Sequence, residues 1–239
     1  MSRLPHPHSA HGRIEHLSDF TSLDWCQDLL SDPSITHIRK RHVLDQRDDV
    51  SNTLFTKTMF TDEAIRAYLS MYRPGKVDRV HDEKAVFTGN ASSGTPGAGA
   101  VQASSAMSSM LSKEEYVWSA TDPDTPEMYL LVSLGREIDG GVRRLHGGVT
   151  ATLLDQVIGT LISQVYDKTC ATASLNVTYK AAVTTPCVLL CRAKVVRKKG
   201  RWIESMGWVE DGQGKVFAEG RGAFVLNRNA SAVAAAAKI

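Results

Sequence analysis

Apolar and polar positions are most regular in the C-terminal half of the chain, where they predict one strand, one long helix and four further strands. The first strand is expected over 128–134, and the helix follows His146-Gly147-Gly148 and runs to about Val165. The later strands are expected over 171–183, 187–198, 201–210 and 215–225, with hairpin signals before the last two. This order predicts an antiparallel sheet with one helix packed on it, the α+β class.

The N-terminal part shows helical rather than strand periodicity. Apolar residues from Phe20 to Leu30 form one stripe of a short helix over 18–30, which ends at Asp32-Pro33. A second helix is predicted over 61–73, with Thr61 as its N-cap, two acidic residues in its first turn and a stop at Pro74-Gly75. Its apolar stripe is Ile65, Tyr68, Leu69 and Tyr72.

Composition changes sharply between these two parts. From 88 to 112, nineteen of twenty-five residues are Gly, Ser, Ala, Thr or Pro, which cannot bury enough apolar surface to offset the entropy of ordering. We therefore expect five segments: a mobile N-terminus (1–17), a helical extension (18–87), a linker (88–112), the sheet domain (113–226) and a flexible tail (227–239).

Charge and apolar runs narrow the classes of partner. The 239 residues include 28 Lys and Arg against 26 Asp and Glu, too even a balance to indicate a nucleic acid or a membrane surface. No apolar run is long enough to predict a membrane span. The first twenty residues lack the apolar segment of a secretory signal, so a cytoplasmic protein is expected, while the lack of acids before Glu15 leaves a transit peptide open.

Neither cysteines nor histidines indicate a structural cross-link. Four cysteines are too few for a disulfide framework, and Cys187 and Cys191 would lie along one strand, so free thiols are expected. Four histidines occur in the first sixteen residues: His6, His8, His11 and His16. Their spacing fits no standard metal site, and we expect no metal and no cofactor.

The long helix carries the candidate chemistry. Asp155 is its one acidic residue between Val149 and Ile162, on a helix that reads as buried nearly all round, so its carboxylate is either hydrogen-bonded structurally or kept for function. Gly147 and Gly148 leave the first amides of the helix uncovered, either as a site for an oxyanion or because the turn needs small residues. His146 either packs at this turn or lines the site.

The spacing of these groups predicts a shared site. Gly148 and Asp155 are seven residues apart, which is about 10 Å along a helix and too far to act on one carbon atom. Amides of one helix would have to work with the aspartate of another, which an antiparallel two-fold pairing supplies. We therefore expect a homodimer, or a dimer of dimers, with two interfacial sites.

Several motifs together resemble the hotdog-fold acyl-CoA thioesterases of the phenylacetate-pathway and 4-hydroxybenzoyl-CoA thioesterase-like superfamily. The resemblance covers roughly 128–226, and Thr53-Leu54-Phe55 with the helix after it also looks like the N-terminal extension of longer eukaryotic members. The motifs are His146-Gly147-Gly148 with Asp155, Thr172-Ala-Ser-Leu-Asn-Val-Thr-Tyr179, Pro186, Lys199-Gly200-Arg201, Asp211-Gly212 and Ala218-Glu219-Gly220-Arg221-Gly222.

The resemblance implies a hotdog fold, in which the sheet wraps around the long helix, and a thioester hydrolase. Asp155 would be the nucleophile or general base, and the Gly147 amide would polarise the thioester carbonyl. His146 would shape this oxyanion hole, and Thr172 would hydrogen-bond the water or the carboxylate, unless it is there simply as a good strand residue. Several relatives carry a polar residue about six positions before the histidine, where this chain has Gly140.

The substrate and one rival function follow from the same resemblance. Six basic residues lie around one hairpin: Arg192, Lys194, Arg197, Lys198, Lys199 and Arg201. They either form a solvated turn or, together with Gly148, a positively charged site for the phosphates of coenzyme A. The expected substrate is an acyl-CoA or acyl-carrier-protein thioester. The alternative is a hotdog protein that does not hydrolyse thioesters, such as a dehydratase, cyclase or polyketide-release factor in biosynthesis; a partner-binding scaffold would leave Asp155 without a role.

Overall fold

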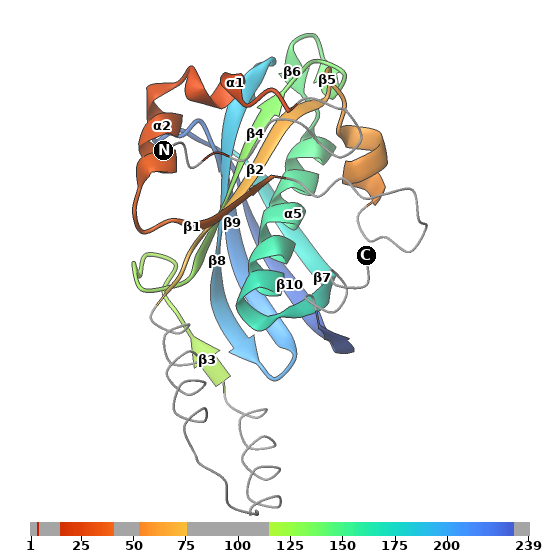
Figure 1. Cartoon of the computed structure of the whole chain (residues 1–239). Coiled ribbons are helices and arrows are strands. Elements are labelled where there is room, and N and C mark those ends of the chain that lie inside the picture. The colour runs from red at the N-terminus through yellow and green to blue at the C-terminus, as the bar shows by residue number, and fades with distance from the viewer. Residues whose placement is uncertain (1–3, 5–14, 41–52, 76–114, 232–239) are drawn as a thin grey trace, which may run out of the picture.

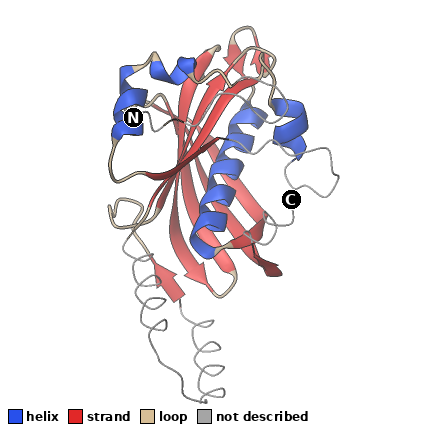
Figure 2. Cartoon of the chain, viewed as in Figure 1, coloured by secondary structure: helices blue, strands red, loops and turns tan. Residues whose placement is uncertain are grey.

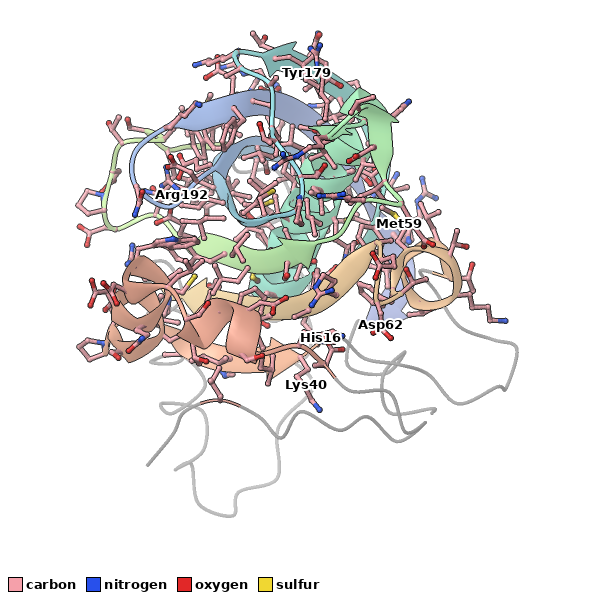
Figure 3. All side chains as sticks on the ribbon, turned by 90° about the horizontal axis from the view of Figure 1, so that it is seen from above. His16, Lys40, Met59, Asp62, Tyr179 and Arg192 are labelled. Carbon is pink, nitrogen blue, oxygen red and sulfur yellow. The ribbon has the colours of Figure 1, made fainter. Side chains whose placement is uncertain are left out.

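A single antiparallel sheet wrapped around one helix forms the body of the protein (Figure 1). The structure is a computed structural model, and it describes residue 4 and residues 15–40, 53–75 and 115–231. The long helix α5 (Gly147–Tyr166) packs against β4, β7, β8, β9 and β10, and Figure 3 shows the sheet curving around it. This arrangement is the hotdog fold and confirms the predicted α+β class.

Only the last three strands of the chain form the predicted meander, because the strand that follows the long helix pairs with the last strand and not with 187–199. The strand order of the sheet is β1 (Thr36–Lys40), β2 (Ile65–Arg73), β4 (Glu127–Leu134), β8 (Cys187–Lys199), β9 (Trp202–Glu210), β10 (Val216–Ser231) and β7 (Lys168–Tyr179). The short β3 (Glu115–Val117) pairs with the end of β8, and β5 (Asp139–Gly141) with β6 (Arg144–Leu145) forms a hairpin before α5. Gly200 and Gly212 have positive φ at the two predicted hairpins, which is why glycine is favoured there.

One face of α5 fills the main core, and the other does not. Its buried residues recur at helical spacing and pack on the concave face of the sheet; they are Thr150, Leu153, Leu154, Val157, Ile158, Leu161 and Ile162. Side chains at Gly207 and Gly220 would press on Leu154, so these glycines let the helix approach the sheet closely. The stripe that contains Asp155 is half-buried, so the prediction of a helix buried nearly all round is wrong.

A second core lies on the opposite face of the sheet. The predicted helix over 18–30 is present as two short helices, α1 (Ser18–Thr21) and α2 (Asp24–Ser31). Phe20, Cys26 and Leu30 from these helices are buried against apolar residues of β2, β4 and β8. In Figure 2 the two helices lie beside the sheet, away from α5. The helical part of the extension therefore covers the outer face of the sheet.

The helix predicted over 61–73 is wrong, because this segment forms β2. Thr61 Oγ1 does accept the Ala64 N–H at 2.9 Å, the hydrogen bond expected of a cap, but the chain is extended from Ile65 onward. Leu69 and Met71 face the outer core while Tyr68 faces the core under α5. Since both faces of β2 are buried, apolar residues occur at almost every position and mimic a helical stripe. Before it, residues Leu54–Met59 form a short π-helical segment, η1.

Residues on either side of the predicted linker belong to one sheet. β2 pairs with β4 along its length, from Ile65 opposite Leu134 to Arg73 opposite Glu127. The extension and the sheet domain are therefore one folding unit, and the separation drawn between them is wrong. The linker over 88–112 lies outside the described residues.

The predicted ends also need correction. Glu15 and Leu17 are buried, so the last part of the segment expected to be mobile is packed, while 1–3 and 5–14 lie outside the described residues. β10 continues to Ser231, so the expected tail begins within a strand, and 232–239 are not described. His6, His8 and His11 lie outside the described part, and His16 contacts Asp62.

Searches of the described residues reveal neither a membrane-spanning helix nor a metal site. None of the helices there has both the length and the apolar character needed to cross a bilayer. No group of three or more potential metal ligands occurs within the same ranges. Cys26, Cys170, Cys187 and Cys191 are free thiols, as expected.

Candidate active site

The start of α5 is organised by His146. This residue is the N-cap, with extended backbone, and its Nδ1 accepts the Gly148 N–H at 2.9 Å. A side chain at position 148 would lie about 3.0 Å from Nδ1, so the glycine leaves room for the ring. Because Nδ1 is the acceptor, the proton of a neutral ring is on Nε2. His146 therefore occupies one of the uncovered amides that the sequence suggested for an oxyanion.

The amide left available is that of Gly147. No acceptor for its N–H is found within the described ranges, and it begins a helix of twenty residues, where the helix dipole favours negative charge. Tyr179 at the end of β7 donates its hydroxyl to the Gly147 carbonyl at 2.8 Å and so fixes the orientation of this turn. Nothing in the spacing of Tyr179 indicates that β7 ends beside the start of α5, so this contact could not be predicted from the sequence.

The missing polar residue at position 140 has a steric explanation. A β-carbon on Gly140 would lie 2.9 Å from the His146 ring, so the ring occupies the space that a side chain there would need. The neighbouring Asp139 does not replace it, because its carboxylate accepts a hydrogen bond from Thr185 Oγ1. Any oxyanion hole here therefore depends on backbone groups more than on this loop.

Asp155 lies farther along α5 and is held by Thr172. The Thr172 hydroxyl on β7 donates to Asp155 Oδ1 at 2.7 Å, so the structure brings together these two predicted residues. Burial and the Asp155 charge raise the pKa of the nearby Cys170 thiol to about 11. Cys170 thus remains a neutral thiol at pH 7.

One chain does not bring Gly147 and Asp155 to a common point. Both belong to the unbroken helix α5, and eight residues correspond to about 12 Å of rise. The described part of the chain thus holds two separate clusters, His146 with Gly147 and Tyr179, and Asp155 with Thr172.

The cations predicted to form a site for the phosphates of coenzyme A lie elsewhere. Lys198 sits 5.7 Å from the ring centre of Tyr166, the last residue of α5, which is about 30 Å long. Arg197 and Lys199 pair with Glu115, and Arg201 donates to the Leu226 carbonyl. These four residues therefore do not reach the start of α5 in this chain, because the hairpin that carries them lies at the opposite end of the helix.

The other two cations of that set are structural. Arg192 donates to Glu127 and Glu210, and Lys194 donates to the Asp122 carbonyl. The hydrogen bonds to Glu210 and the charges of both carboxylates raise the pKa of Arg192 further, so it stays charged. This cluster lies on the outer face of the sheet and holds β4, β8 and β9 together.

Residues 143–218 match the family model of the thioesterase superfamily, a span of about a third of the chain. Over this segment the chain is similar to the thioesterase superfamily. The match runs from β6 into β10 and includes Gly147, Asp155 and Thr172. It confirms the resemblance drawn from the sequence motifs.

Solved structures from several organisms are similar to part of the chain. Zebrafish thioesterase superfamily member 2 is 23% identical, with 47% of this chain and 81% of that chain covered and a TM-score of 0.40. A Bacillus halodurans protein solved with CoA is 25% identical, over 52% of this chain and 80% of that one, with a TM-score of 0.40. A hypothetical thioesterase from Streptococcus pneumoniae solved with coenzyme A is 15% identical, over 49% and 92%, with a TM-score of 0.42. No curated protein matches the chain in sequence.

Proposed function

We propose that this protein hydrolyses acyl thioesters, with Asp155 as the attacking or proton-accepting group. The observation that carries the proposal is the Asp155 carboxylate, which Thr172 holds on the half-buried stripe of α5. The same helix begins with the Gly147 N–H, for which the described part of the chain offers no acceptor. A carboxylate and an oxyanion donor are the two groups that acyl transfer from sulfur requires. The proposed substrates are thioesters of coenzyme A or of an acyl carrier protein.

Two routes use the same residues. In one, Asp155 takes a proton from water as the water oxygen attacks the thioester carbon, and the carbon–sulfur bond then breaks as the proton passes to the sulfur. In the other, the carboxylate attacks first and expels a thiolate, and water then cleaves the resulting anhydride, which regenerates the carboxylate and releases the proton that the thiolate takes up. In both, the Gly147 N–H donates to the carbonyl oxygen as it becomes negative, and Thr172 keeps Asp155 oriented.

The working unit in this proposal is a dimer with shared sites. Within the described ranges β7 pairs only with β10, so its other edge is unpaired, and most of its side chains are exposed. Exposed edge strands of this length are normally covered in native proteins. Antiparallel pairing of two such edges about a two-fold axis would cover the Asp155 stripe and carry Gly147 of one protomer toward Asp155 of its partner.

The test is release of free thiol from acyl-CoA esters of increasing chain length, with wild type and Asp155→Asn compared at equal concentration. The amide keeps the shape of the carboxylate but neither attacks nor accepts a proton, so we expect a loss of at least about a hundredfold in kcat. Asp28→Asn on α2 is the matched control, because it removes an exposed carboxylate far from α5. Near-normal turnover by folded Asp155→Asn would contradict the proposed role. Binding of acyl-CoA by wild type without thiol release would favour a non-hydrolytic hotdog protein.

A further inference from the structure

The start of α5 separates two hollows of different chemical character. The first, which we call the cationic hollow, has a volume of about 490 Å³ and is lined by Arg144, Gly147, Tyr179, Lys180, Ala181 and Ala182 among others. The second, the apolar groove, has a volume of about 530 Å³ and contains His146 and Gly148 in its wall. Tyr179 lines the first hollow and Met59 lines the second, and both residues are labelled in Figure 3. Gly147 and Gly148 are adjacent, so both hollows reach the same turn of helix.

The cationic hollow favours an anion. Arg144 and Lys180 line it, and no carboxylate is among its lining residues. Glu219 lies outside the lining and pairs with Lys180 at 2.6 Å, which offsets part of that charge, while Arg144 forms no ion pair with any described residue. The first turn of α5 adds the positive end of the helix dipole.

The apolar groove has the opposite preference. Leu54 and Met59 of η1 form one wall, and Ala64, Ile138 and Val149 complete the apolar lining. Leu54 is 51% exposed, so its side chain is accessible to a ligand that enters the groove. The charged groups are the carboxylates of Glu137 and Asp139, which accept hydrogen bonds from Thr61 and Thr185, and no lysine or arginine lines the groove.

We infer that the substrate lies across the start of α5, with its phosphate-bearing thiol arm in the cationic hollow and its acyl group in the apolar groove. This inference rests on the proposed thioester hydrolysis and adds to it the orientation of the substrate and the residues that select each arm. The thiol arm of such a thioester carries negative charge and the acyl arm is apolar, which matches the cationic hollow and the apolar groove in turn. The carbonyl group between the two arms then lies at the Gly147 N–H. η1 is then the element that selects the acyl group. Arg144 and Lys180 then bind the phosphates, in place of the cations that the sequence suggested for coenzyme A.

The thiol arm is tested with pairs of esters that share one acyl group. Coenzyme A carries phosphates, whereas N-acetylcysteamine is a truncated thiol without any. Arg144→Ala should lower kcat/KM for the acyl-CoA about tenfold, mainly through KM, and leave the N-acetylcysteamine ester within about twofold, as expected for loss of a charge-assisted contact. Lys180→Ala should act in the same direction with a smaller effect, because Glu219 already offsets its charge. Arg39→Ala, which removes an exposed arginine on β1, is the matched control and should change neither ester.

An ester of phosphopantetheine separates the two sources of the thiol arm. It carries the single phosphate that an acyl carrier protein presents, without the nucleotide of coenzyme A. If Arg144 contacts this phosphate, Arg144→Ala affects the phosphopantetheine ester as strongly as the CoA ester. If it contacts the nucleotide phosphates, only the CoA ester responds.

The acyl arm is tested by narrowing the groove. Leu54→Trp should lower kcat/KM for dodecanoyl esters about tenfold more than for acetyl esters, because each excluded methylene loses its transfer free energy. The shift should be equal for CoA and N-acetylcysteamine esters, since the acyl group is the same. Val117→Trp enlarges an exposed apolar residue on β3, 73% exposed, and should leave the chain-length profile unchanged.

The outcomes separate this inference from the proposed function. Arg144→Ala acting equally on esters with and without phosphate, or Leu54→Trp leaving the chain-length profile unchanged, would overturn the inference while hydrolysis itself stands. If wild type hydrolyses no thioester, calorimetric titration with CoA alone still decides the thiol arm, since Arg144→Ala must weaken CoA binding about tenfold and Arg39→Ala must not. Equal CoA affinity of wild type and Arg144→Ala would reject the cationic hollow.

Discussion

At the scale of single residues, His146 determines which backbone amide of α5 remains available. Its ring accepts the Gly148 N–H, and the same ring excludes any side chain at Gly140. The position of this one ring thus explains why glycine occurs both at position 148 and at position 140. Its observed role is to cap the helix, and the proposed function assigns the Gly147 N–H to the oxyanion.

Substitution of His146 should separate capping from chemistry. His146→Ala removes the acceptor for the Gly148 N–H and should lower the free energy of unfolding by about 1 kcal/mol, whereas His146→Asn, a good N-cap, should restore most of it. Urea denaturation of the three proteins provides the measurement. If His146→Asn restores stability but not thiol release, the imidazole must take part in the reaction as well as cap the helix, which would contradict a role in capping alone.

The four cysteines should show a pH dependence set by burial. Burial raises the pKa of Cys170 to about 11 and those of Cys26 and Cys187 to about 12, and it raises that of Cys191 as well. At pH 8, Cys170 should be thiolate in roughly one molecule in a thousand, against about a quarter for an exposed thiol. Iodoacetamide labelling followed by mass spectrometry should therefore be slow in the native protein and fast in denaturant.

Linkage gives the sign of the accompanying stability change. Because the folded-state pKa values exceed those of the unfolded thiols, the stability is fully present below about pH 8.5 and decreases as the pH rises toward 11. Rapid labelling of Cys170 in the native state at pH 8 would show that this thiol is more exposed than the structure describes.

At the scale of elements, β2 illustrates how a strand can carry a helical pattern. Tyr68 and Leu69 are neighbours in sequence but belong to different cores, one under α5 and one under α1 and α2. A helix would separate the two side chains by only about 100° and could include both in one wide apolar stripe, whereas a strand places them on opposite faces. A strand and a helix over 65–73 therefore predict different energetic coupling of Tyr68 and Leu69 to the residues of α1.

A pair of double-mutant cycles should distinguish them. Phe20 of α1 shares a core with Leu69, so Phe20→Leu with Leu69→Val should show a coupling energy of about 0.5–3 kcal/mol. Phe20→Leu with Tyr68→Leu should add within about 0.5 kcal/mol, because Tyr68 lies in the other core. Unfolding free energies of the single and double variants give both terms. Equal coupling in the two cycles would contradict the strand.

At the scale of the whole molecule, the proposed activity requires two chains, because α5 holds Gly147 and Asp155 about 12 Å apart. Mixing two inactive variants should therefore regenerate activity. Asp155→Ala retains the amide, and Gly147→Pro retains the carboxylate but lacks the N–H. Random exchange at equal concentrations should restore up to about a quarter of wild-type activity, from one intact site in each heterodimer.

The local structure favours folding of the proline variant. Proline is well tolerated at the first position of a helix, and His146 before it already has the extended backbone that proline prefers. A β-carbon at Gly147 would meet Tyr179 at 3.5 Å, an ordinary contact. Circular dichroism and the oligomer mass of each variant serve as controls. A mixture that demonstrably exchanges subunits yet stays inactive would show that each site is built within one chain.

The local pattern of apolar and polar residues was sufficient to predict an element wherever one face of it is buried, or where a turn needs a particular residue. The alternation of β8, β9 and β10, the glycines at their hairpins and the capped start of α5 are all properties of short segments, so the order of these elements was predicted correctly. The pairing of Asp155 with Thr172 came from a family resemblance, and the hydrogen bond between them agrees with that expectation. The polar residues of α5 also marked the helix that carries the candidate site.

What the sequence by itself determined is therefore the order of the long elements from β4 onward without the β5–β6 hairpin, the free thiols and the helix that holds Asp155, because each depends on residues close together in the chain. Only the tertiary structure decided that 65–73 is a strand, since burial on both faces removes the period of two that would reveal it. It also decided that Lys198 lies at the far end of α5 while Arg144 and Lys180 lie beside Gly147. Distances between residues of different strands depend on register and on sheet curvature, and no local pattern contains them.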